Sequence, residues 1–189
     1  IYQQYFMVSN AAQLILMEMK EKQYDLRKMY DYAVIQINDT HPSMIIPELI
    51  RILVNDKAFT MDEAIEVVSK TCAYTNHTIL AEALEKWPIG MFSKLLPRVY
   101  QIIDEISRRW HESFDTTQEG WQERLRQTAI LWDGEIRMAN LSVICSHSVN
   151  GVAKIHSDII KNIVLKDFYA LTPEKFNNKT NGISHRRFF

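Results

Sequence analysis

The sequence predicts a helix-rich α/β fold. Apolar residues recur at helical spacing in several long segments, a pattern typical of amphipathic helices packed on a core. Two short runs, 33–37 and 72–75, instead suggest buried strands, and a polar loop follows each run directly. The chain has 189 residues, of which 47% are apolar, and this is enough for a hydrophobic core. We therefore expect short strands among helices, with polar loops at the strand ends, where open α/β sheets bind their ligands.

The first part of the chain is predicted to form helix, strand and helix. Residues 3–22 carry apolar side chains close to helical spacing and predict the first helix. The β-branched run at 33–37 predicts a strand that enters a polar turn at 38–42, whose Asn and Asp favour turns. Proline suits the first position of a helix, so Pro47 predicts a second helix over residues 47–55.

The next segment repeats the order of helix, strand and polar loop. Residues 60–63 have the sequence of a capping box, which predicts a helix from 61 to about 70. The run at 72–75 is the second predicted strand, and it leads into the polar loop 76–78. Residues 80–87 have a helical pattern that a proline then interrupts.

The middle of the chain is predicted to be helical with one break. Pro97 begins a long amphipathic helix that continues through Trp110. Residues 115–120 form the break, after which 121–131 are predicted to be helical, and the Asp-Gly pair at 133–134 predicts a turn.

The last part of the chain is less clearly patterned. Residues 141–145 fit either a strand or a buried helix. Residues 150–151 precede a predicted helix, residues 172–174 begin a short helical turn, and 177–184 are predicted to be a polar loop. The helix after residue 151 places four apolar residues on one face: Val152, Ile155, Ile159 and Ile163.

Composition and charge exclude several classes of protein. There are 22 Lys and Arg against 23 Asp and Glu, so nothing attracts nucleic acid or an anionic membrane, and no apolar run is long enough to span a bilayer. Cys72 and Cys145 lie far apart outside any CxxC pattern, which favours a reducing compartment, the cytoplasm. The chain begins with Ile and ends on Phe-Phe, so we expect a piece of a longer polypeptide.

The polar loops offer the side chains that a neutral sugar needs. A sugar presents several hydroxyls, and its site must pair them with donors and acceptors, because unpaired buried polar groups are costly. Residue types alone leave an ordinary turn as the alternative, since Asn, Asp and Thr are common in turns. The candidate residues are Asn38, Asp39, Thr40, His41, Asn76, His77, Thr78 and Asn181.

Other chemistries have weaker support. A metal site could use Asp39, His41, His77, His147 and His156, but no tight ligand spacing occurs, and the last two are more typical of capping or core-edge histidines. Both cysteines lie in apolar runs, and no serine has a GxSxG context. A glycoside hydrolase needs two carboxylates, and the candidate loops contain only one, that of Asp39.

Long motifs follow one another in order across nearly the whole chain. They are residues 36–42 with 47–49, 70–78 with 82–87, 95–98, 146–157 and 176–187. In this order they resemble the α-glucan phosphorylase family, which includes glycogen, starch and maltodextrin phosphorylases. The resemblance implies an incomplete part of a two-lobed Rossmann-like fold of the glycosyltransferase B type. Residues 1–176 would be the last part of the first lobe, and 177–189 the crossover into the second.

The resemblance also implies an activity. The family transfers a glucosyl unit between an α-1,4-glucan and inorganic phosphate, giving glucose 1-phosphate, with pyridoxal phosphate as a cofactor whose phosphate assists proton transfer. His77 would lie beside the glucosyl unit, Asn181 would bind near its 6-hydroxyl, and Val149 would form a nearby wall. Asp39 and His41 would lie towards the gate or the acceptor side of the site. The implied substrate-binding residues are thus His77, Asn181, Asp39, His41, Val149 and Thr78, and none of them transfers a proton.

The resemblance leaves the catalytic half of the site outside this chain. No lysine here matches the family's cofactor lysine, which would lie beyond Phe189 with the phosphate-binding residues. We therefore expect the chain alone to be inactive and to self-associate, and the whole protein to be a homodimer. The competing hypothesis is a stand-alone, non-enzymatic domain that binds carbohydrate or serves as a scaffold; a metal hydrolase is the remaining alternative.

Overall fold

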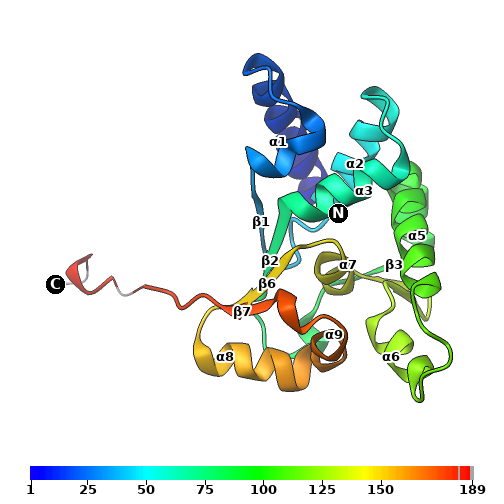
Figure 1. The fold of residues 1–189 in the computed structure, drawn as a ribbon, viewed down its shortest axis with the longest axis vertical. Coiled ribbons are helices and arrows are strands. Elements are labelled where there is room, and N and C mark those ends of the chain that lie inside the picture. The colour runs from blue at the N-terminus through cyan, green and yellow to red at the C-terminus, as the bar shows by residue number, and fades with distance from the viewer. Residues whose placement is uncertain (183, 188–189) are drawn as a thin grey trace.

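Four parallel strands form the central sheet of the computed structural model, which describes residues 1–182 and 184–187 (Figure 1). Their order across the sheet is β1-β2-β6-β7, and each neighbouring pair is parallel. The strands are β1 (Ile35–Asn38), β2 (Cys72–Thr75), β6 (Ser148–Gly151) and β7 (Phe176–Asn178). Because all four run the same way, the segments that follow them emerge at one edge of the sheet.

Helices account for most of the rest of the described chain. The α-helices are α1 (Tyr2–Glu21), α2 (Ile45–Asp56), α3 (Met61–Thr71), α4 (Ile89–Leu95), α5 (Pro97–Glu112), α6 (Trp121–Thr128), α7 (Met138–Ile144), α8 (Lys154–Ile159) and α9 (Lys166–Leu171). The 3₁₀ segments are η1 (Leu26–Asp31), η2 (Ala81–Ala83), η4 (Pro173–Lys175) and η5 (His185–Arg187), and η3 (Ile160–Val164) is a π-helix. The helix-rich α/β class predicted from the sequence is confirmed.

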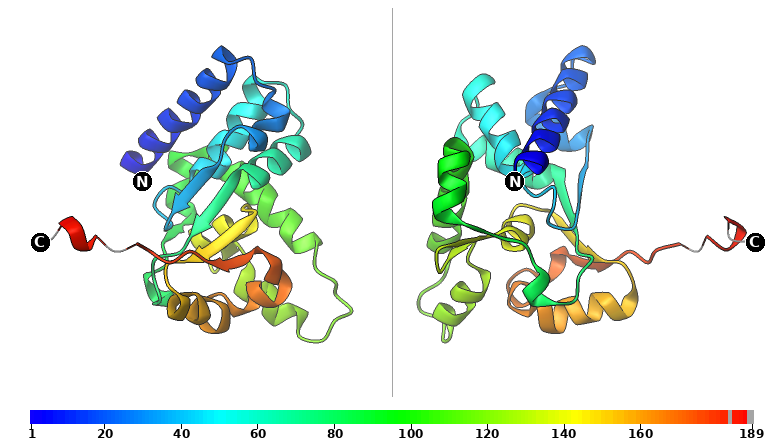
Figure 2. Two further views of the ribbon diagram at one scale, coloured as in Figure 1. Left: turned by 60° about the vertical axis from the view of Figure 1, so that its left-hand side comes forward. Right: turned by 180° about the vertical axis from the view of Figure 1, so that it is seen from behind.

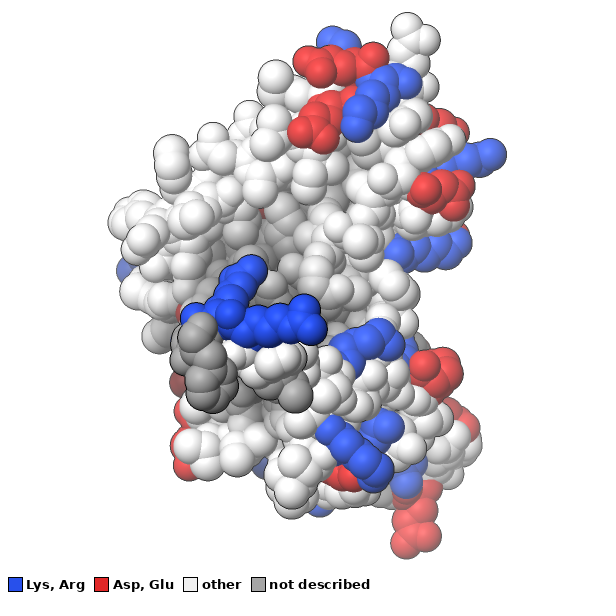
Figure 3. All heavy atoms as spheres, turned by 90° about the vertical axis from the view of Figure 1, so that its left-hand side faces the viewer, with Lys and Arg blue, Asp and Glu red and all other residues white. Residues whose placement is uncertain are grey.

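The helices are distributed unevenly around the sheet. Figure 1 shows α2, α3, α5 and α7 on one side of it, with α8 and α9 beside the β6–β7 half. Turned so that the other side comes forward, the strands lie at the front without a helix drawn over them (Figure 2, left). On that side the surface is largely uncharged, apart from the Lys and Arg around the C-terminal segment and a charged margin (Figure 3).

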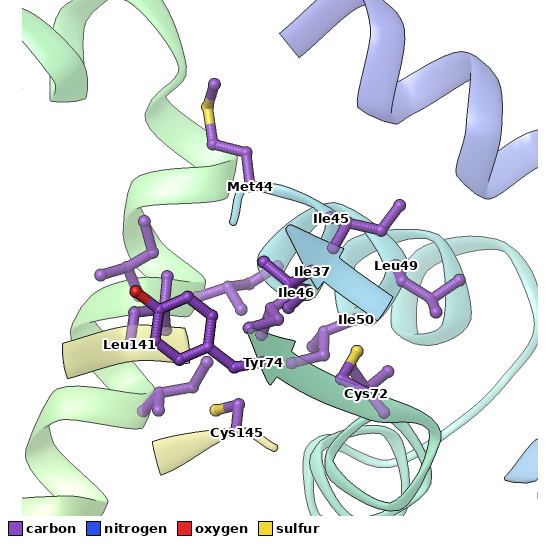
Figure 4. Close-up of a cluster of buried hydrophobic side chains, with 14 of the residues drawn as sticks. Ile37, Met44, Ile45, Ile46, Leu49, Ile50, Cys72, Tyr74, Leu141 and Cys145 are labelled. Atoms are coloured by element: carbon purple, nitrogen blue, oxygen red, sulfur yellow. The ribbon is translucent and has the colours of Figure 1, made fainter. Parts of the chain in front are cut away.

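The core lies between the sheet and the helices of the β1-to-β2 crossover. The register aligns Ile37, Tyr74, Val149 and Phe176 in one row across the four strands, and all four side chains are buried. Helix α2 adds Ile46, Leu49 and Ile50, which are fully buried, and Leu141 of α7 joins the same cluster (Figure 4). Burial of each such side chain stabilises the fold by about 1.5–3 kcal/mol, so this row anchors the sheet on its helices.

A buried carboxylate joins α1 to α2. Glu48 of α2 has no exposed side-chain surface, and it accepts hydrogen bonds from Tyr5 Oη (3.0 Å) and Ser9 Oγ (2.7 Å) of α1. Arg51, one turn along α2, donates Nε and Nη2 to both carboxylate oxygens at 2.8 Å. Burial alone would raise the pKa of Glu48, but the bonds from Arg51 and Ser9 outweigh it, and the pKa lies below its usual value.

Elements with strong local signals are confirmed. Helix α3 begins at the predicted capping box, in which Thr60 Oγ1 accepts from the N–H of Glu63 and the Glu63 carboxylate accepts from the N–H of Thr60. Helix α5 begins at Pro97 as predicted, and β2 has its predicted bounds. The segment at 141–145, which fitted either element, is mostly helix α7.

The helix predicted over residues 80–87 is wrong. The structure has the short η2 there, followed by strand β3 (Lys86–Pro88), which pairs antiparallel with β5 (Glu135–Arg137). Strand β4 (Leu131–Trp132) pairs with the other edge of β5 and completes a second sheet, so the helix predicted over 121–131 ends early, at Thr128. These strands depend on pairing between distant segments, which local periodicity does not reveal.

The Asp-Gly turn inside this second sheet is confirmed. Asp133 and Gly134 have φ values of 50° and 73°, both in the left-handed region that two-residue hairpin turns require.

Some predicted bounds also need correction. Strand β1 begins at Ile35 rather than residue 33, and α2 begins at Ile45, two residues before Pro47. Strand β6, whose four residues include Ser148 and Asn150, was not predicted. The first two residues of the predicted loop 177–184 belong to β7. Polar side chains interrupt the apolar pattern of these short strands, so hydrophobicity alone does not predict them.

The apolar face predicted after residue 151 is only partly buried, because Val152 and Ile159 are half-buried and the other two residues are exposed. Ile155 and Ile163 are 74% and 67% exposed, whereas His156, Ser157 and Ile160 are buried. The first turn of α8 packs its polar side against the end of β6, and the helix changes to π geometry at η3, so the 3.6-residue period does not describe the whole segment.

Candidate functional site

The three predicted polar loops, which follow β1, β2 and β7, meet at the carboxyl edge of the parallel sheet. Backbone bonds extend the ladder beyond the strands and fix the loops beside one another: the N–H of Asp39 donates to Thr75 O at 2.8 Å, and that of Asn76 to Asn150 O at 3.0 Å. On the other side of β6, the N–H of Lys179 donates to Gly151 O at 3.1 Å. Ligands of open α/β sheets bind at such an edge.

The loop after β1 turns sharply at Asp39. Its φ of 59° lies in the left-handed region, which Asp tolerates better than most residues, and its Oδ1 accepts the N–H of Thr40 at 2.6 Å. Asp39 is half-buried, and His41 is exposed two residues later, before α2. This conformation brings the chain directly from the edge strand back over the core.

His77 is the exposed imidazole of the loop after β2. Its Nε2 lies 3.4 Å from Oδ1 of Asn38, so the first two loops present an imidazole and an amide side by side. Thr78 is half-buried, and its Oγ1 accepts the N–H of Leu80 at 3.4 Å. The ring and the amide can each donate to or accept from a hydroxyl, which is the chemistry that a sugar requires.

Asn181 reaches the same edge from β7. Its backbone N–H donates to the carbonyl of Val152, just after β6, at 3.0 Å, and its side chain is exposed. The C-terminal segment that carries it leaves the body of the molecule along this side (Figure 1). Asn38, His77 and Asn181 therefore all present amide or imidazole groups at the carboxyl edge of the sheet.

Val149 does not reach the surface of this edge. It lies in the middle of β6 and is fully buried in the row that contains Tyr74 and Phe176. The structure therefore places it under the site, in the core that supports the loops.

A series of side-chain hydrogen bonds across the sheet was not predicted from the sequence. Gln36 Nε2 donates to Thr75 Oγ1 at 2.7 Å, and Thr75 Oγ1 donates to Asn150 Oδ1 at 2.9 Å. Asn150 Nδ2 in turn donates to the carbonyl of Gly151 at 2.9 Å. These hydrogen bonds could have been predicted from the polar residue that each of the three strands carries next to its buried apolar residue, on the opposite side of the sheet.

Asn76 carries a buried acceptor under the same loops. Its side chain is fully buried, and Nδ2 donates to Tyr74 Oη at 3.2 Å. Within the described residues, Asn76 Oδ1 has no hydrogen-bond partner. A buried polar atom without a hydrogen-bond partner is uncommon in a folded protein. This one lies next to His77 in the sequence, so the loop after β2 contains an acceptor that the described residues leave unpaired.

The residues proposed for a metal or a nucleophile are dispersed. No group of three or more His, Cys, Asp or Glu side chains in residues 1–182 and 184–187 is placed to hold a metal ion. His147, expected as a capping or core-edge residue, is exposed because it precedes β6 at the opposite edge of the sheet, whereas His156 is buried as expected.

Both cysteines behave as small apolar residues. Cys72 and Cys145 are free and buried, and burial raises the pKa of each thiol, for Cys145 to about 12. Neither thiol is therefore a reactive nucleophile at neutral pH. No helix in the described part of the chain has the length and apolar character needed to cross a bilayer.

The chain is similar in sequence to known phosphorylases. The carbohydrate phosphorylase family model matches residues 1–189. The maltodextrin phosphorylase of Streptococcus pneumoniae is 51% identical over 189 residues, which are 100% of this chain and 24% of that protein. The brain form of glycogen phosphorylase from Homo sapiens is 48% identical over 197 residues, covering 98% and 23% of the two chains. Bacillus subtilis glycogen phosphorylase is 46% identical over 186 residues, with 98% and 23% covered.

The chain thus spans about a quarter of the length of these relatives, with sequence identity near one half along nearly all of it. It belongs to the carbohydrate phosphorylase family.

Proposed function

We propose that this chain supplies the sugar-holding loops of a phosphorylase that transfers a glucosyl unit between an α-1,4-glucan and inorganic phosphate, giving glucose 1-phosphate. One observation carries the proposal: the loops after β1, β2 and β7, which carry the family motifs, lie at one sheet edge, and backbone bonds tie each of them to a neighbouring strand or loop. The names of the relatives, maltodextrin and glycogen phosphorylase, support the substrate class.

The exposed side chains suit a neutral sugar. His77 and Asn181 would bind hydroxyls of the glucosyl unit, Asn181 near the 6-hydroxyl, while Asp39 and His41 would lie towards the acceptor glucan. Each correct hydrogen bond to a substrate hydroxyl favours that sugar over an analogue that leaves the protein group unpaired. These residues bind and orient the sugar, and they leave the proton transfers to groups outside this chain.

The cofactor implied by the family, pyridoxal phosphate, does not fit the two lysines that flank β7. Lys175, just before the strand, is half-buried, its Nζ donates to the α7 carbonyls of Val143 (3.2 Å) and Ile144 (3.1 Å), and burial lowers its pKa. Lys179, just after the strand, donates its Nζ to Asn177 Oδ1 at 2.7 Å. Both amines thus already have acceptors within this chain. We therefore propose that the cofactor lysine lies in another part of the protein, and we assign no step of the cofactor to this chain.

The proposed whole protein has two Rossmann-like lobes, is a homodimer and acts in the cytoplasm. Residues 1–176 would form the last part of the first lobe, and 177–189 would cross into the second. In support of this division, the C-terminal segment leaves the sheet after β7 and extends away from the helices (Figure 2, right). The chain alone is proposed to be inactive and to self-associate, since Phe6 and Met7 of α1 are 70% and 64% exposed.

A chimaera tests the proposed function. In it, this chain replaces the region of the S. pneumoniae maltodextrin phosphorylase with which it is 51% identical. With pyridoxal phosphate and inorganic phosphate, we expect the chimaera to release glucose 1-phosphate from maltodextrin and the chain alone to release none. A folded chimaera that binds the cofactor but releases no product would contradict the proposed function.

Activity of the isolated chain would refute its proposed dependence on the rest of the protein. Maltoheptaose binding by the isolated chain, measured by calorimetry, would instead favour the stand-alone carbohydrate-binding domain.

A further inference from the structure

His156 is a buried imidazole whose two nitrogens face two of the candidate loops. It lies in the first turn of α8 and is 8% exposed. Nδ1 accepts the backbone N–H of Val152 at 3.1 Å, and Nε2 lies 3.5 Å from the carbonyl oxygen of Thr78, at the long end of hydrogen-bond distances. The ring therefore spans the gap between the segment after β6 and the loop that follows β2.

These contacts fix the position of the proton on the ring. A backbone N–H can only donate, so Nδ1 must be unprotonated to accept it. A carbonyl oxygen can only accept, so Nε2 must carry the proton that points at Thr78. Both contacts are satisfied together only by the neutral ring with its proton on Nε2.

The backbone of Val152 carries the connection to the third loop. Its N–H donates to His156, and its carbonyl accepts the N–H of Asn181 at 3.0 Å. A single side chain thus links the backbone of Thr78, beside His77, to the backbone that holds Asn181. This linkage therefore connects the two loops that carry His77 and Asn181, the residues assigned to the glucosyl unit.

The packing of α8 keeps His156 in place. The adjacent Ser157 is 3% exposed, and its Oγ donates at 2.9 Å to Oδ1 of Asn178, the last residue of β7. At Gly151 a Cβ atom would lie 2.6 Å from that Oγ and 3.0 Å from Ser157 Cα, so the end of β6 and the first turn of α8 approach closely. The imidazole is therefore held by packing on one side and by two backbone groups on the other.

We propose that His156, with its proton on Nε2, is a positioning residue that sets the separation of the His77–Thr78 loop and the Asn181 loop. The role in sugar binding rests on the proposed function, whereas the linkage itself does not. His156 touches no substrate and acts through the two loops. Displacing a binding group by about 1 Å is enough to weaken catalysis strongly, so a side chain that sets this separation affects both affinity and turnover.

The tautomer is tested on this chain by NMR of its ¹⁵N-labelled histidines. We expect the ring of His156 to show a bare Nδ1 and a protonated Nε2. A neutral ring with its proton on Nδ1 would overturn the proposal, because that nitrogen could not then accept the N–H of Val152. This measurement needs no substituted protein and no activity.

The linkage is tested with His156→Ala and His156→Asn, and with His147→Asn as the matched control at the exposed opposite edge. In the chain itself, we expect the alanine variant to shift the backbone amide signals of both Thr78 and Asn181. The asparagine variant, whose side-chain oxygen can replace Nδ1 as an acceptor, should restore the Asn181 signal more than the Thr78 signal. Unchanged signals at both amides in His156→Ala would overturn the linkage, as would equal shifts in the control.

The same substitutions in the chimaera separate this proposal from the proposed function. We expect His156→Ala to raise KM for maltodextrin and to lower kcat/KM at least ~10-fold, with partial recovery in His156→Asn and no change in the control. Amide shifts accompanied by unchanged kinetics would overturn the positioning role while leaving the linkage intact. A parent chimaera without activity would count against the proposed function alone, since the NMR results stand independently.

Discussion

Gly151 is the residue whose replacement tests the packing beneath the loops most simply. It ends β6, and a Cβ there would lie 3.0 Å from both Ser157 Cα and Ile160 Cδ1. Because the Cα atom belongs to the backbone of α8, the clash cannot be relieved by rotating a side chain. Gly151 is therefore required for the close approach of β6 and α8 that positions His156.

Substituting Gly151→Ala should destabilise the chain by about 1–3 kcal/mol, the usual cost of overpacking a tight interior, as measured by urea unfolding. Gly90→Ala is the matched control: nothing lies within 4 Å of the added Cβ, and in helix α4 alanine should stabilise by up to about 1 kcal/mol. Equal stabilities of the two variants would show that β6 and α8 do not approach as closely as the structure has them.

At the scale of elements, the joint between α1 and α2 depends on one ionised side chain. Glu48 is the acceptor for donors from both helices, and its pKa is lowered because Arg51 and Ser9 stabilise the carboxylate more than burial destabilises it. A lowered pKa in the folded state means that the stabilisation is present above the unfolded pKa of about 4.5 and is lost as the pH falls through the folded value.

Glu48→Gln should therefore cost about 1.5–3 kcal/mol at pH 7, the range for hydrogen bonds to charged groups, and the cost should shrink below about pH 4.5. Urea unfolding of both proteins across this range gives the difference. Glu66→Gln serves as control, because its ion pair with Lys70 is exposed and should change stability by less than about 1 kcal/mol at any pH. A cost for Glu48→Gln that does not vary with pH would contradict an ionised Glu48.

The elements that could be predicted from the sequence are those with local chemical signals. Thr60 and Glu63 define the start of α3, and Pro97 defines the start of α5, because the interactions that begin these helices lie within one turn. Strand β3 could not be predicted in the same way, because its partner β5 lies about fifty residues along the chain.

The candidate site likewise combines residues found from local motifs with a connection that depends on distant segments. His77 and Asn181 lie in motifs that the sequence displays directly. Their connection through His156 could not be predicted, because residues 77, 156 and 181 become neighbours only when β2, β6 and β7 pair. The apolar stripe of Ile155 and Ile163 even suggested the opposite orientation for α8, since surface exposure of isoleucines is not visible in periodicity.

At the scale of the whole molecule, the outer side of α1 is an apolar surface. Tyr2, Phe6, Met7, Leu14 and Met17 are each more than half exposed, and a groove of about 290 Å³ beside them is lined mainly by apolar residues of α1 and β1. Apolar surface of this extent is characteristic of a protein contact. This is the basis for the proposed self-association.

We expect the isolated chain to form dimers or larger species in light scattering, and Phe6→Lys to shift them towards monomer, because a charge would have to be desolvated at the contact. Gln122→Lys adds the same charge at an exposed polar position of α6, away from α1, and should leave the distribution unchanged. A monodisperse monomer for the unsubstituted chain would count against self-association.

The central claim is that the loops at the carboxyl edge of the sheet hold the sugar, and His77 tests it most directly. The measurement is kcat/KM for maltodextrin phosphorolysis by the chimaera carrying His77→Ala, compared with His147→Ala at the other edge of the sheet. Loss of a hydrogen bond worth about 1–3 kcal/mol predicts a fall of roughly 5- to 150-fold for His77→Ala and none for the control. Equal activity of the two variants and the parent would contradict the claim.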